Sequence, residues 1–366
     1  MILKKIVRFV FLFSLIVAVL PVEHVQAAKG IPGSGQFGYG VRVSINDANL
    51  KPALECASKI NPDWIVVDLF WNEFTPKSNT SPDWTNLDLV MRFAGDQHIP
   101  VMISLTRPPA WALSDRGPDA DLTFKWIVTL INRYPETLQA VEIFAGANTR
   151  QGWGAKPAPK AYARLFSSLQ EQTAAQGLSI TLVAGGLIPV VEDDSENEIS
   201  DITFLQKLYD NDLKEFMPVI SLQMPNTTGG PLTPPDGQES RYLRHYEEIR
   251  QVMLNNNHST GLIWITRLAP PNGSINSSDK SYLSNENRTQ WLAQTLNQLQ
   301  SQLYLGIAVF DSVDPASKPM GGCNIQNSAS ILANQNDQTK GQKSTHHPLK
   351  QGRPKSQLIG KGEPPA

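Results

Sequence analysis

Residues that could bind or cleave a sugar lie near the carboxyl ends of several short apolar runs of this chain, or directly after them. Aromatic rings stack on the apolar faces of pyranose rings, and planar polar groups bind the hydroxyls. Carboxylic acids and carboxylates transfer protons in general acid–base chemistry. The candidate residues are Arg42, Asp68, Trp71, Glu73, Arg107, Trp111, Glu142, Asn148, Trp153, Gln223, Arg267 and Asp311.

The runs that precede these residues are short and rich in Val, Ile, Leu and aromatic residues. They show no sustained polar alternation, which is typical of strands buried on both faces, as in parallel sheets. Between them, apolar residues recur at three- and four-residue steps, which indicates helices; one is expected to begin at Leu122, after Asp121 as its cap. The predicted strands are Phe37–Ser44, Trp64–Phe70, Pro100–Leu105, Ala140–Phe144, Ile180–Ala184, Val219–Gln223, Leu262–Thr266 and Gly306–Phe310.

Eight strands that alternate with seven helices predict a (β/α)8 TIM barrel, an α/β fold built as a single domain. The eighth helix is expected to be short or absent, because the character of the sequence changes beyond Asp314. The alternative is an open doubly wound sheet. That fold usually has a glycine-rich phosphate loop after its first strand, whereas Gly38-Tyr39-Gly40 lies inside the first run. Functional residues of a barrel lie at the carboxyl ends of its strands, as the candidates here do.

The two ends of the chain differ from its middle. Residues 1–27 combine three basic residues with an apolar run and a Val-Gln-Ala ending, which predicts a cleaved signal peptide. The apolar run, about 12 residues, is too short to cross a bilayer core of about 30 Å. We therefore expect an extracellular protein, secreted or periplasmic, with its barrel in residues 28–334 and no membrane partner after cleavage. Residues 335–366 are polar and predict a disordered tail.

Charge, histidines and cysteines exclude or leave open several classes of function. Residues 1–27 carry a net charge of +2 and residues 335–366 a net charge of +4, which leaves −8 for residues 28–334. Nucleic acid is not expected as a partner, because its phosphates would be repelled.

The histidines form no close pair outside the tail, so we expect neither a metal nor another cofactor. Cys56 and Cys323 are either bridged or free, and the acidic loop Glu192–Glu198 is either a calcium site or, as we favour, a solvated loop.

A resemblance to a known superfamily is carried by two segments. The stretch Val141–Asn148, followed by Trp153, resembles the fourth-strand signature Glu-Ile-Trp-Asn-Glu-Pro-Asn of the clan-A retaining glycoside hydrolases, which include xylosidase- and cellulase-like TIM barrels. Ile263–Leu268 resembles their seventh-strand signature Trp-Ile-Thr-Glu-Phe. The likeness covers residues 37–314 through the order and spacing of its segments. It implies a groove for an oligosaccharide or polysaccharide.

The same resemblance implies that both catalytic positions hold other residues. Gly146 corresponds to the general acid/base of the family, and Arg267 corresponds to the nucleophile. Ala145 stands where the family has an asparagine that holds the sugar. Retaining hydrolysis needs two carboxyl groups about 5–5.5 Å apart. Glycine has no titratable group, and arginine stays protonated and cannot attack the sugar. We therefore expect a catalytically degenerate member of the superfamily.

Glu142 and Arg267 are expected to be structural. Glu142 lies four residues before Gly146, and period-two alternation predicts that both point into the barrel. A buried charge must be paired. We therefore expect a salt bridge from Glu142 to Arg42 or Arg267, and we expect Arg267 to neutralise one of the acidic candidates. Binding of an acidic sugar by Arg267 is the alternative.

Tryptophans are the best candidates for contact with a ligand. Trp71, Trp111 and Trp153 follow predicted strands, although each could instead pack beneath a loop. Trp64 and Trp264 lie inside strands and are assigned to the core. The predicted ligand-binding residues are Asp68, Trp71, Trp111, Glu142, Asn148, Trp153 and Asp311.

The preferred hypothesis is a non-catalytic, glycosidase-like barrel outside the cell, whose groove binds a glycan or mediates protein contacts. One alternative is an active glycosidase that uses displaced carboxylates, namely Asp68, Glu73 or Asp311, with inverting geometry. Another is an extracellular scaffold or interaction protein, because fold alone does not specify activity.

Overall fold

The structure of the protein is a computed structural model. The structure describes residues 32–46, 50–190, 194, 196–225, 227–235, 241–269 and 285–311. The predicted leader and tail, Cys323 and the segment after the last strand all lie outside these residues. The predictions for the signal peptide, the disulfide and the eighth helix therefore stay predictions. Within the described residues, no helix is both long and apolar enough to span a bilayer.

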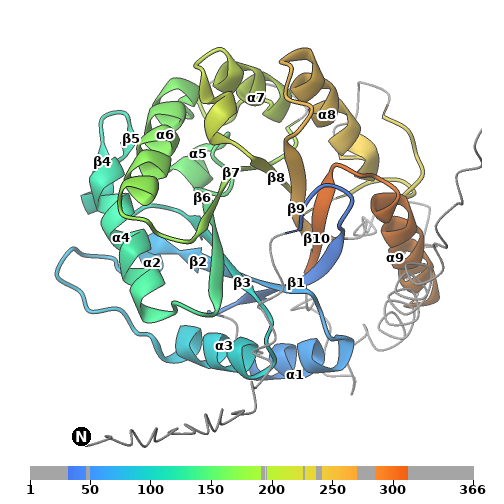
Figure 1. The fold of residues 1–366 in the computed structure, drawn as a ribbon, viewed down its shortest axis with the longest axis horizontal. Helices are drawn as coiled ribbons and strands as arrows, with labels where there is room; N and C mark the ends of the chain where they lie inside the picture. The colour runs from blue at the N-terminus through green and yellow to red at the C-terminus, as the bar shows by residue number, and fades with distance from the viewer. Residues whose placement is uncertain are drawn as a thin grey trace, which may run out of the picture.

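Parallel strands form a closed barrel in the order β1-β10-β9-β8-β7-β6-β3-β2 (Figure 1). The predicted TIM barrel is thus confirmed, and the open doubly wound sheet is wrong. A short antiparallel pair, β4 (Leu113–Ser114) and β5 (Gly117–Pro118), lies in the connection after β3. The barrel strands are β1 (Gly38–Ser44), β2 (Trp64–Phe70), β3 (Val101–Thr106), β6 (Leu138–Ile143), β7 (Thr181–Leu187), β8 (Val219–Met224), β9 (Leu262–Leu268) and β10 (Leu305–Asp311).

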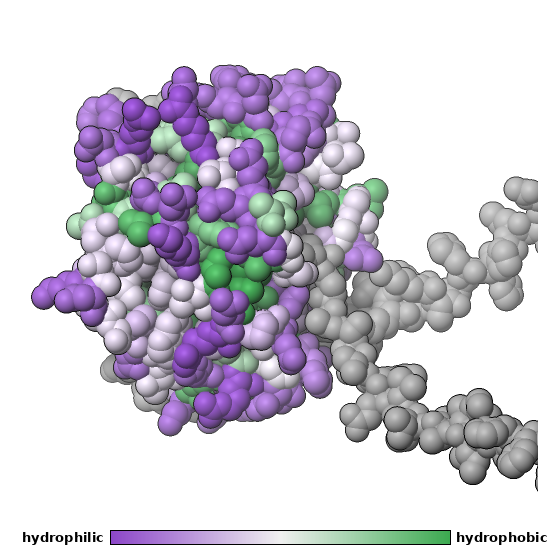
Figure 2. Space-filling model, turned by 60° about the vertical axis from the view of Figure 1, so that its left-hand side comes forward, coloured by the Kyte–Doolittle hydropathy of each residue, from purple (hydrophilic) through white to green (hydrophobic). Residues whose placement is uncertain are grey.

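Helices surround the barrel and pack their apolar sides on its outer surface (Figure 1). Seen from the side of α4 and the β4–β5 pair, the surface is polar over most of its area, with a smaller apolar region near its centre (Figure 2). The helices are α1 (Leu50–Ile60), α2 (Trp71–Phe74), α3 (Thr85–Asp96), α4 (Ala120–Arg133), α5 (Arg150–Trp153), α6 (Pro159–Ala175), α7 (Asp201–Tyr209), α8 (Tyr246–Asn255) and α9 (Asn285–Gln300).

Helix α4 begins earlier than the sequence predicts. Its cap is Asp119 rather than Asp121, and the Asp119 carboxylate accepts a hydrogen bond of 2.9 Å from the Leu122 backbone N–H. Asp121 lies in the first turn instead, where a negative charge also stabilises a helix. Both aspartates fit the start of a helix, so composition alone did not separate them.

The inside of the barrel has its own apolar core, separate from the core beneath the helices. Trp64 and Trp264 fill it with ring centroids 5.4 Å apart, which confirms their assignment to the core. Gly306 makes room for them, because a Cβ at this position would lie 2.3 Å from Trp264 Nε1. The packed interior leaves the polar residues at the carboxyl ends of the strands.

A buried histidine connects α7 to α8. His245 Nε2 lies 2.6 Å from the carboxylate of Asp201, and Nδ1 lies 2.6 Å from that of Glu248. We call these three residues the α7–α8 clasp. Burial alone would lower the pKa of His245, but the hydrogen bonds to Asp201 and Glu248 raise it to about 9. Both ring nitrogens therefore carry protons near neutral pH and donate to carboxylates.

We predict that the α7–α8 clasp makes stability depend on pH. The folded pKa of His245 lies above its ordinary value of 6.5, so the clasp stabilises the protein fully below that pH and is lost as the pH rises towards 9. The difference between the two pKa values corresponds to about 3 kcal/mol. Urea unfolding at about pH 6 and about pH 9 should show the free energy of unfolding fall in the wild type.

The same measurement on two variants assigns the effect. In His245→Gln the clasp-dependent fall should disappear. His98→Asn is the matched control, because His98 is exposed and has a positive φ that asparagine tolerates. This variant should keep the wild-type fall, and an undiminished fall in His245→Gln would contradict the prediction.

Candidate functional site

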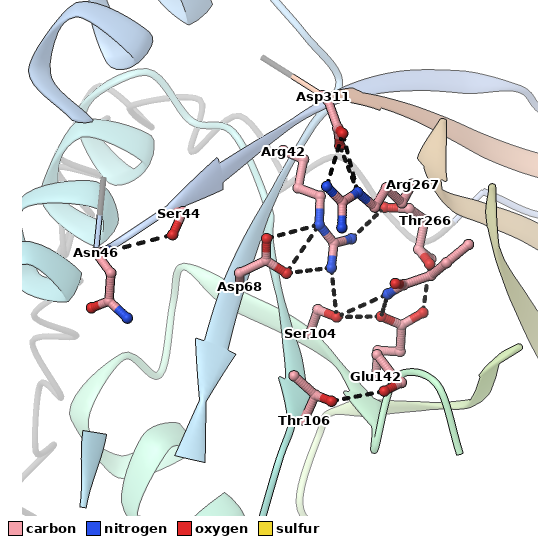
Figure 3. A network of polar contacts seen from close by, with 12 residues as sticks. Arg42, Ser44, Asn46, Asp68, Ser104, Thr106, Glu142, Thr266, Arg267 and Asp311 are labelled. Carbon is pink, nitrogen blue, oxygen red and sulfur yellow. Dashed lines mark hydrogen bonds and ion pairs between the residues drawn. The ribbon is translucent and has the colours of Figure 1, made fainter. Parts of the chain in front are cut away.

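A network of polar side chains occupies the carboxyl-terminal mouth of the barrel (Figure 3). It connects strands on opposite sides of the barrel through side-chain hydrogen bonds and ion pairs. Its members are Arg42 from β1, Asp68 from β2, Ser104 from β3, Glu142 from β6, Gln223 from β8, Thr266 and Arg267 from β9, and Asp311 from β10.

Arg42 is the buried cation of this network, with 4% of its side chain exposed. Its Nε donates to both carboxylate oxygens of Asp68, at 3.0 and 3.1 Å. Its Nη1 donates to the Thr266 carbonyl at 2.7 Å, and its Nη2 to Ser104 Oγ at 3.0 Å. Burial alone would lower the pKa of Arg42, but Asp68 outweighs this effect and Glu142 adds to it, so the pKa lies above its ordinary value.

Glu142 is fully buried, but it forms no salt bridge with a described arginine, so the predicted pairing with Arg42 or Arg267 is wrong. Its carboxylate accepts hydrogen bonds from Ser104 Oγ at 2.5 Å, Thr266 Oγ1 at 2.5 Å and Gln223 Nε2 at 3.1 Å. Figure 3 shows Ser104 between Glu142 and the guanidinium of Arg42. The hydroxyl thus contacts both charged groups, and uncharged donors satisfy the carboxylate.

Arg267 is paired with Asp311, one of the partners that the sequence allows. Its Nε lies 3.1 Å from both carboxylate oxygens, and its Nη2 lies 3.1 Å from Oδ2. The two side chains are 38% and 26% exposed. Asp311 is also the register partner of Arg42 on the neighbouring strand. Charges therefore alternate in sign along the adjacent strands β2, β1, β10 and β9.

The turn after β6 places Gly146 differently from the prediction. The strand ends at Ile143, and Phe144 adopts a left-handed conformation with φ of 53°. The alternation that would point Gly146 into the barrel therefore stops before it. Gly146 itself has φ of 77°, and a Cβ here would lie 3.2 Å from Ile188 Cδ1 and 3.3 Å from Thr149 Oγ1. A side chain at this position would begin among packed loop atoms.

Two of the predicted ligand-facing tryptophans are buried. Trp71 is 0% and Trp153 is 1% exposed, and both pack against Phe144, with ring centroids 6.4 and 5.7 Å away. They therefore belong to the packing under the loops, which was the alternative. Trp111 is partly exposed, and its Nε1 donates to the Thr75 carbonyl at 2.9 Å. Of the three, Trp111 alone has surface left for a ligand.

Asn148 is also a structural residue. Its side chain is fully buried and donates to the carbonyls of Ile188 and Ile199, at 2.8 and 2.9 Å. Its Oδ1 accepts from the Ile188 backbone N–H at 3.0 Å. All of these bonds connect loops of the same face, so the prediction of Asn148 as a ligand-binding residue does not fit its position.

Glu73 and Arg107 lie at the rim rather than inside the network. Arg107 Nη1 is 3.2 Å from Glu73 Oε1, and the side chains are 32% and 48% exposed. Asn46 donates to the other carboxylate oxygen of Glu73 at 2.9 Å. Glu73 is therefore the most exposed of the three displaced carboxylates considered from the sequence.

The acidic loop before α7 is described only in part. Glu196 forms ion pairs with Arg150 and Lys156, and Asp194 accepts from the side chain of Asn197 at 2.6 Å. The described residues contain no group of three or more side chains suited to a metal ion. The carboxylates of Asp194 and Glu196 thus contact neighbouring groups of their own chain.

Sequence reasoning missed the hydroxyl residues of the network. Ser104 and Thr266 lie inside apolar runs, where a hydroxyl is easily taken for a neutral core residue. The hydroxyl side chains of both residues lie on the same face of the barrel sheet as the charged side chains that they contact. A buried glutamate on another strand of the barrel is the signal that could have found them, because such a carboxylate needs donors.

We predict unequal effects from removing the two arginines. The Asp68 side chain is only 14% exposed, and Arg42→Met removes the cation that neutralises it. This substitution should therefore lower the free energy of unfolding by about 3 kcal/mol. Arg267→Met removes a more exposed cation and should lower it by less than about 1 kcal/mol. Urea denaturation of both variants beside the wild type tests this difference, and equal losses would contradict it.

Comparisons with known proteins agree on the fold and do not extend beyond it. No protein-family model and no curated protein matches this sequence. Solved structures with the same fold include xylanase 10B from Thermotoga maritima, with a TM-score of 0.52, 13% identity, and coverage of 83% of this chain and 97% of that chain. A family 30 endoxylanase from Clostridium papyrosolvens has a TM-score of 0.50 and 9% identity, with coverage of 83% and 72%.

A family 39 glycoside hydrolase from the gut symbiont Bacteroides cellulosilyticus also has this fold. Its TM-score is 0.52 at 15% identity, over 75% of this chain. The chain spans 56% of the length of that protein. The fold of this chain is therefore similar to that of several glycoside hydrolases, and the TIM barrel that the predicted likeness implies is confirmed.

Proposed function

We propose that this protein is a non-hydrolytic, glycosidase-like barrel that binds carbohydrate at the carboxyl-terminal mouth of the barrel. The leader-like sequence of residues 1–27 places this function outside the cell in our proposal.

The observation that carries the proposal is the engagement of the carboxylates in the mouth. Asp68 is paired with Arg42, Asp311 is paired with Arg267, and Glu142 is fully buried under three hydrogen bonds. A nucleophile must reach the anomeric carbon, and a general acid must carry a proton that it can give up. Each of these three carboxylates is instead engaged by side chains of its own chain.

The backbone around Gly146 supports the same conclusion. A Cβ at this position would meet Ile188 Cδ1 at 3.2 Å and Thr149 Oγ1 at 3.3 Å, and the φ of 77° would strain any residue other than glycine. The inactive interpretation thus rests on the conformation of the turn as well as on the residue type. Arg267 adds a permanent cation where an oxocarbenium ion would form in a related hydrolase.

Carbohydrate binding is supported by the chemistry of the mouth and by structures with this fold. Asp68, Glu73 and Asp311 keep exposed surface there and have oxygens that accept from sugar hydroxyls. Trp111 adds a partly exposed ring. A xylanase from Thermotoga petrophila with this fold, TM-score 0.51 and 12% identity, was solved in complex with xylobiose. The neutral probe that follows from this is xylotriose.

We predict binding of xylotriose without cleavage. Isothermal titration calorimetry should detect binding in the wild type, while chromatography of the same mixture after prolonged incubation should show intact xylotriose. Aryl glycosides should also stay uncleaved. Turnover that Asp68→Asn or Glu73→Gln abolishes would instead establish a hydrolase with displaced carboxylates. Absence of binding to xylotriose and to a wider panel of oligosaccharides would favour the scaffold alternative.

We also predict that restoring the family glutamates does not restore hydrolysis. The double variant Gly146→Glu, Arg267→Glu should remain inactive, because the φ of 77° and the close atoms of Ile188 and Thr149 oppose a glutamate at residue 146. Its free energy of unfolding should fall by at least about 1 kcal/mol, since a non-glycine residue at this φ is strained. Arg267→Glu alone is the control, and cleavage of aryl glycosides by the double variant would refute the backbone argument.

A further inference from the structure

The row of alternating charges in the mouth ends at Arg267. Around the barrel it runs through Asp68, Arg42, Asp311 and Arg267, on strands β2, β1, β10 and β9. The register partner of Arg267 on the next strand, β8, is Gln223, which is uncharged. Arg42 therefore has an aspartate on each side, whereas Arg267 has one on a single side.

Arg267 also has hydrogen-bonding capacity left. Its Nε faces Asp311, and its Nη2 lies 3.1 Å from the same carboxylate. Nη1 has no partner among the described residues. The side chain is 38% exposed, compared with 4% for Arg42. A guanidinium presents its donors as a planar fork that matches a carboxylate, so the outer edge of Arg267 suits a second carboxylate.

The position of this edge selects the kind of ligand. It lies at the carboxyl-terminal end of the barrel, where the bound molecules of this fold are found. We propose that Arg267 binds the carboxylate of a uronic acid residue, so that the carbohydrate taken by this protein is an acidic oligosaccharide. This inference rests on the proposed carbohydrate function and specifies its ligand. The sugar carboxylate would extend the alternation of charge beyond Arg267.

Two acidic probes, each with a neutral match, test the assignment. The probes are trigalacturonate and xylotriose that carries one glucuronic acid, each beside the same oligosaccharide after chemical reduction of its carboxyl groups. In calorimetric titrations at fixed ionic strength, the wild type should bind at least one acidic probe ten times or more tightly than its reduced match. Equal affinities for both pairs would overturn the inference and leave the proposed function intact.

Variants locate the effect on Arg267. Arg267→Gln should lower the affinity for the acidic probe at least tenfold and leave the reduced probe unchanged. Asp311→Asn should raise the affinity for the acidic probe, because it removes the competing carboxylate. Arg133→Gln is the matched control, since Arg133 is also 38% exposed and also paired with an aspartate, Asp88, but lies at the end of α4. It should bind as the wild type does.

The remaining outcomes separate the two proposals. Loss of affinity in Arg133→Gln equal to that in Arg267→Gln would overturn the assignment, because a distant charge would then suffice. Displacement of trigalacturonate by an equal concentration of inorganic phosphate would show a general anion site and overturn the choice of a uronic acid. Failure of all acidic and neutral oligosaccharides to bind would overturn the carbohydrate function itself.

Discussion

Charges that fold into the mouth of a closed barrel must find partners there, because the packed apolar interior below cannot solvate them. Arg42 and Glu142 meet this constraint in different ways. The arginine pairs with Asp68, and the glutamate accepts bonds from hydroxyl and amide groups. Ser104 contacts both, so one hydroxyl connects the two parts of the network. Removing a partner from such a network leaves a charge buried, which is more destabilising than the bond itself is stabilising.

The same constraint bears on function. A carboxylate that neutralises a buried arginine serves stability, as Asp68 does beside Arg42. In our proposal, the carboxylates of this network do not form a hydrolytic pair. The side chains of Arg267 and Asp311 are more exposed to solvent than those of Arg42 and Asp68. We therefore separate the mouth into a buried framework around Arg42 and an exposed pair that a ligand can contact.

Aromatic residues illustrate why a sequence position is weak support for a ligand contact. Trp71 and Trp153 both follow strand ends, as sugar-stacking tryptophans do, but Phe144 turns the chain at the end of β6 and packs against both of them. Phe144 has a left-handed backbone conformation, with φ of 53°, where it makes these two ring contacts. Trp111, from a different connection, stays partly exposed. Burial of a large ring depends on which other side chains arrive from distant segments.

The sequence by itself determined the barrel, because strand-like runs and helical periodicity are local patterns that repeat in a regular order. It also determined which residue types stand at the two family positions, Gly146 and Arg267. Only the tertiary structure decided the partners. Arg267 pairs with Asp311, and Glu142 accepts hydrogen bonds from Ser104, Thr266 and Gln223. These partners depend on strand order and register around a closed sheet. These contacts join residues up to 124 positions apart, a separation at which local sequence patterns carry no information about distance.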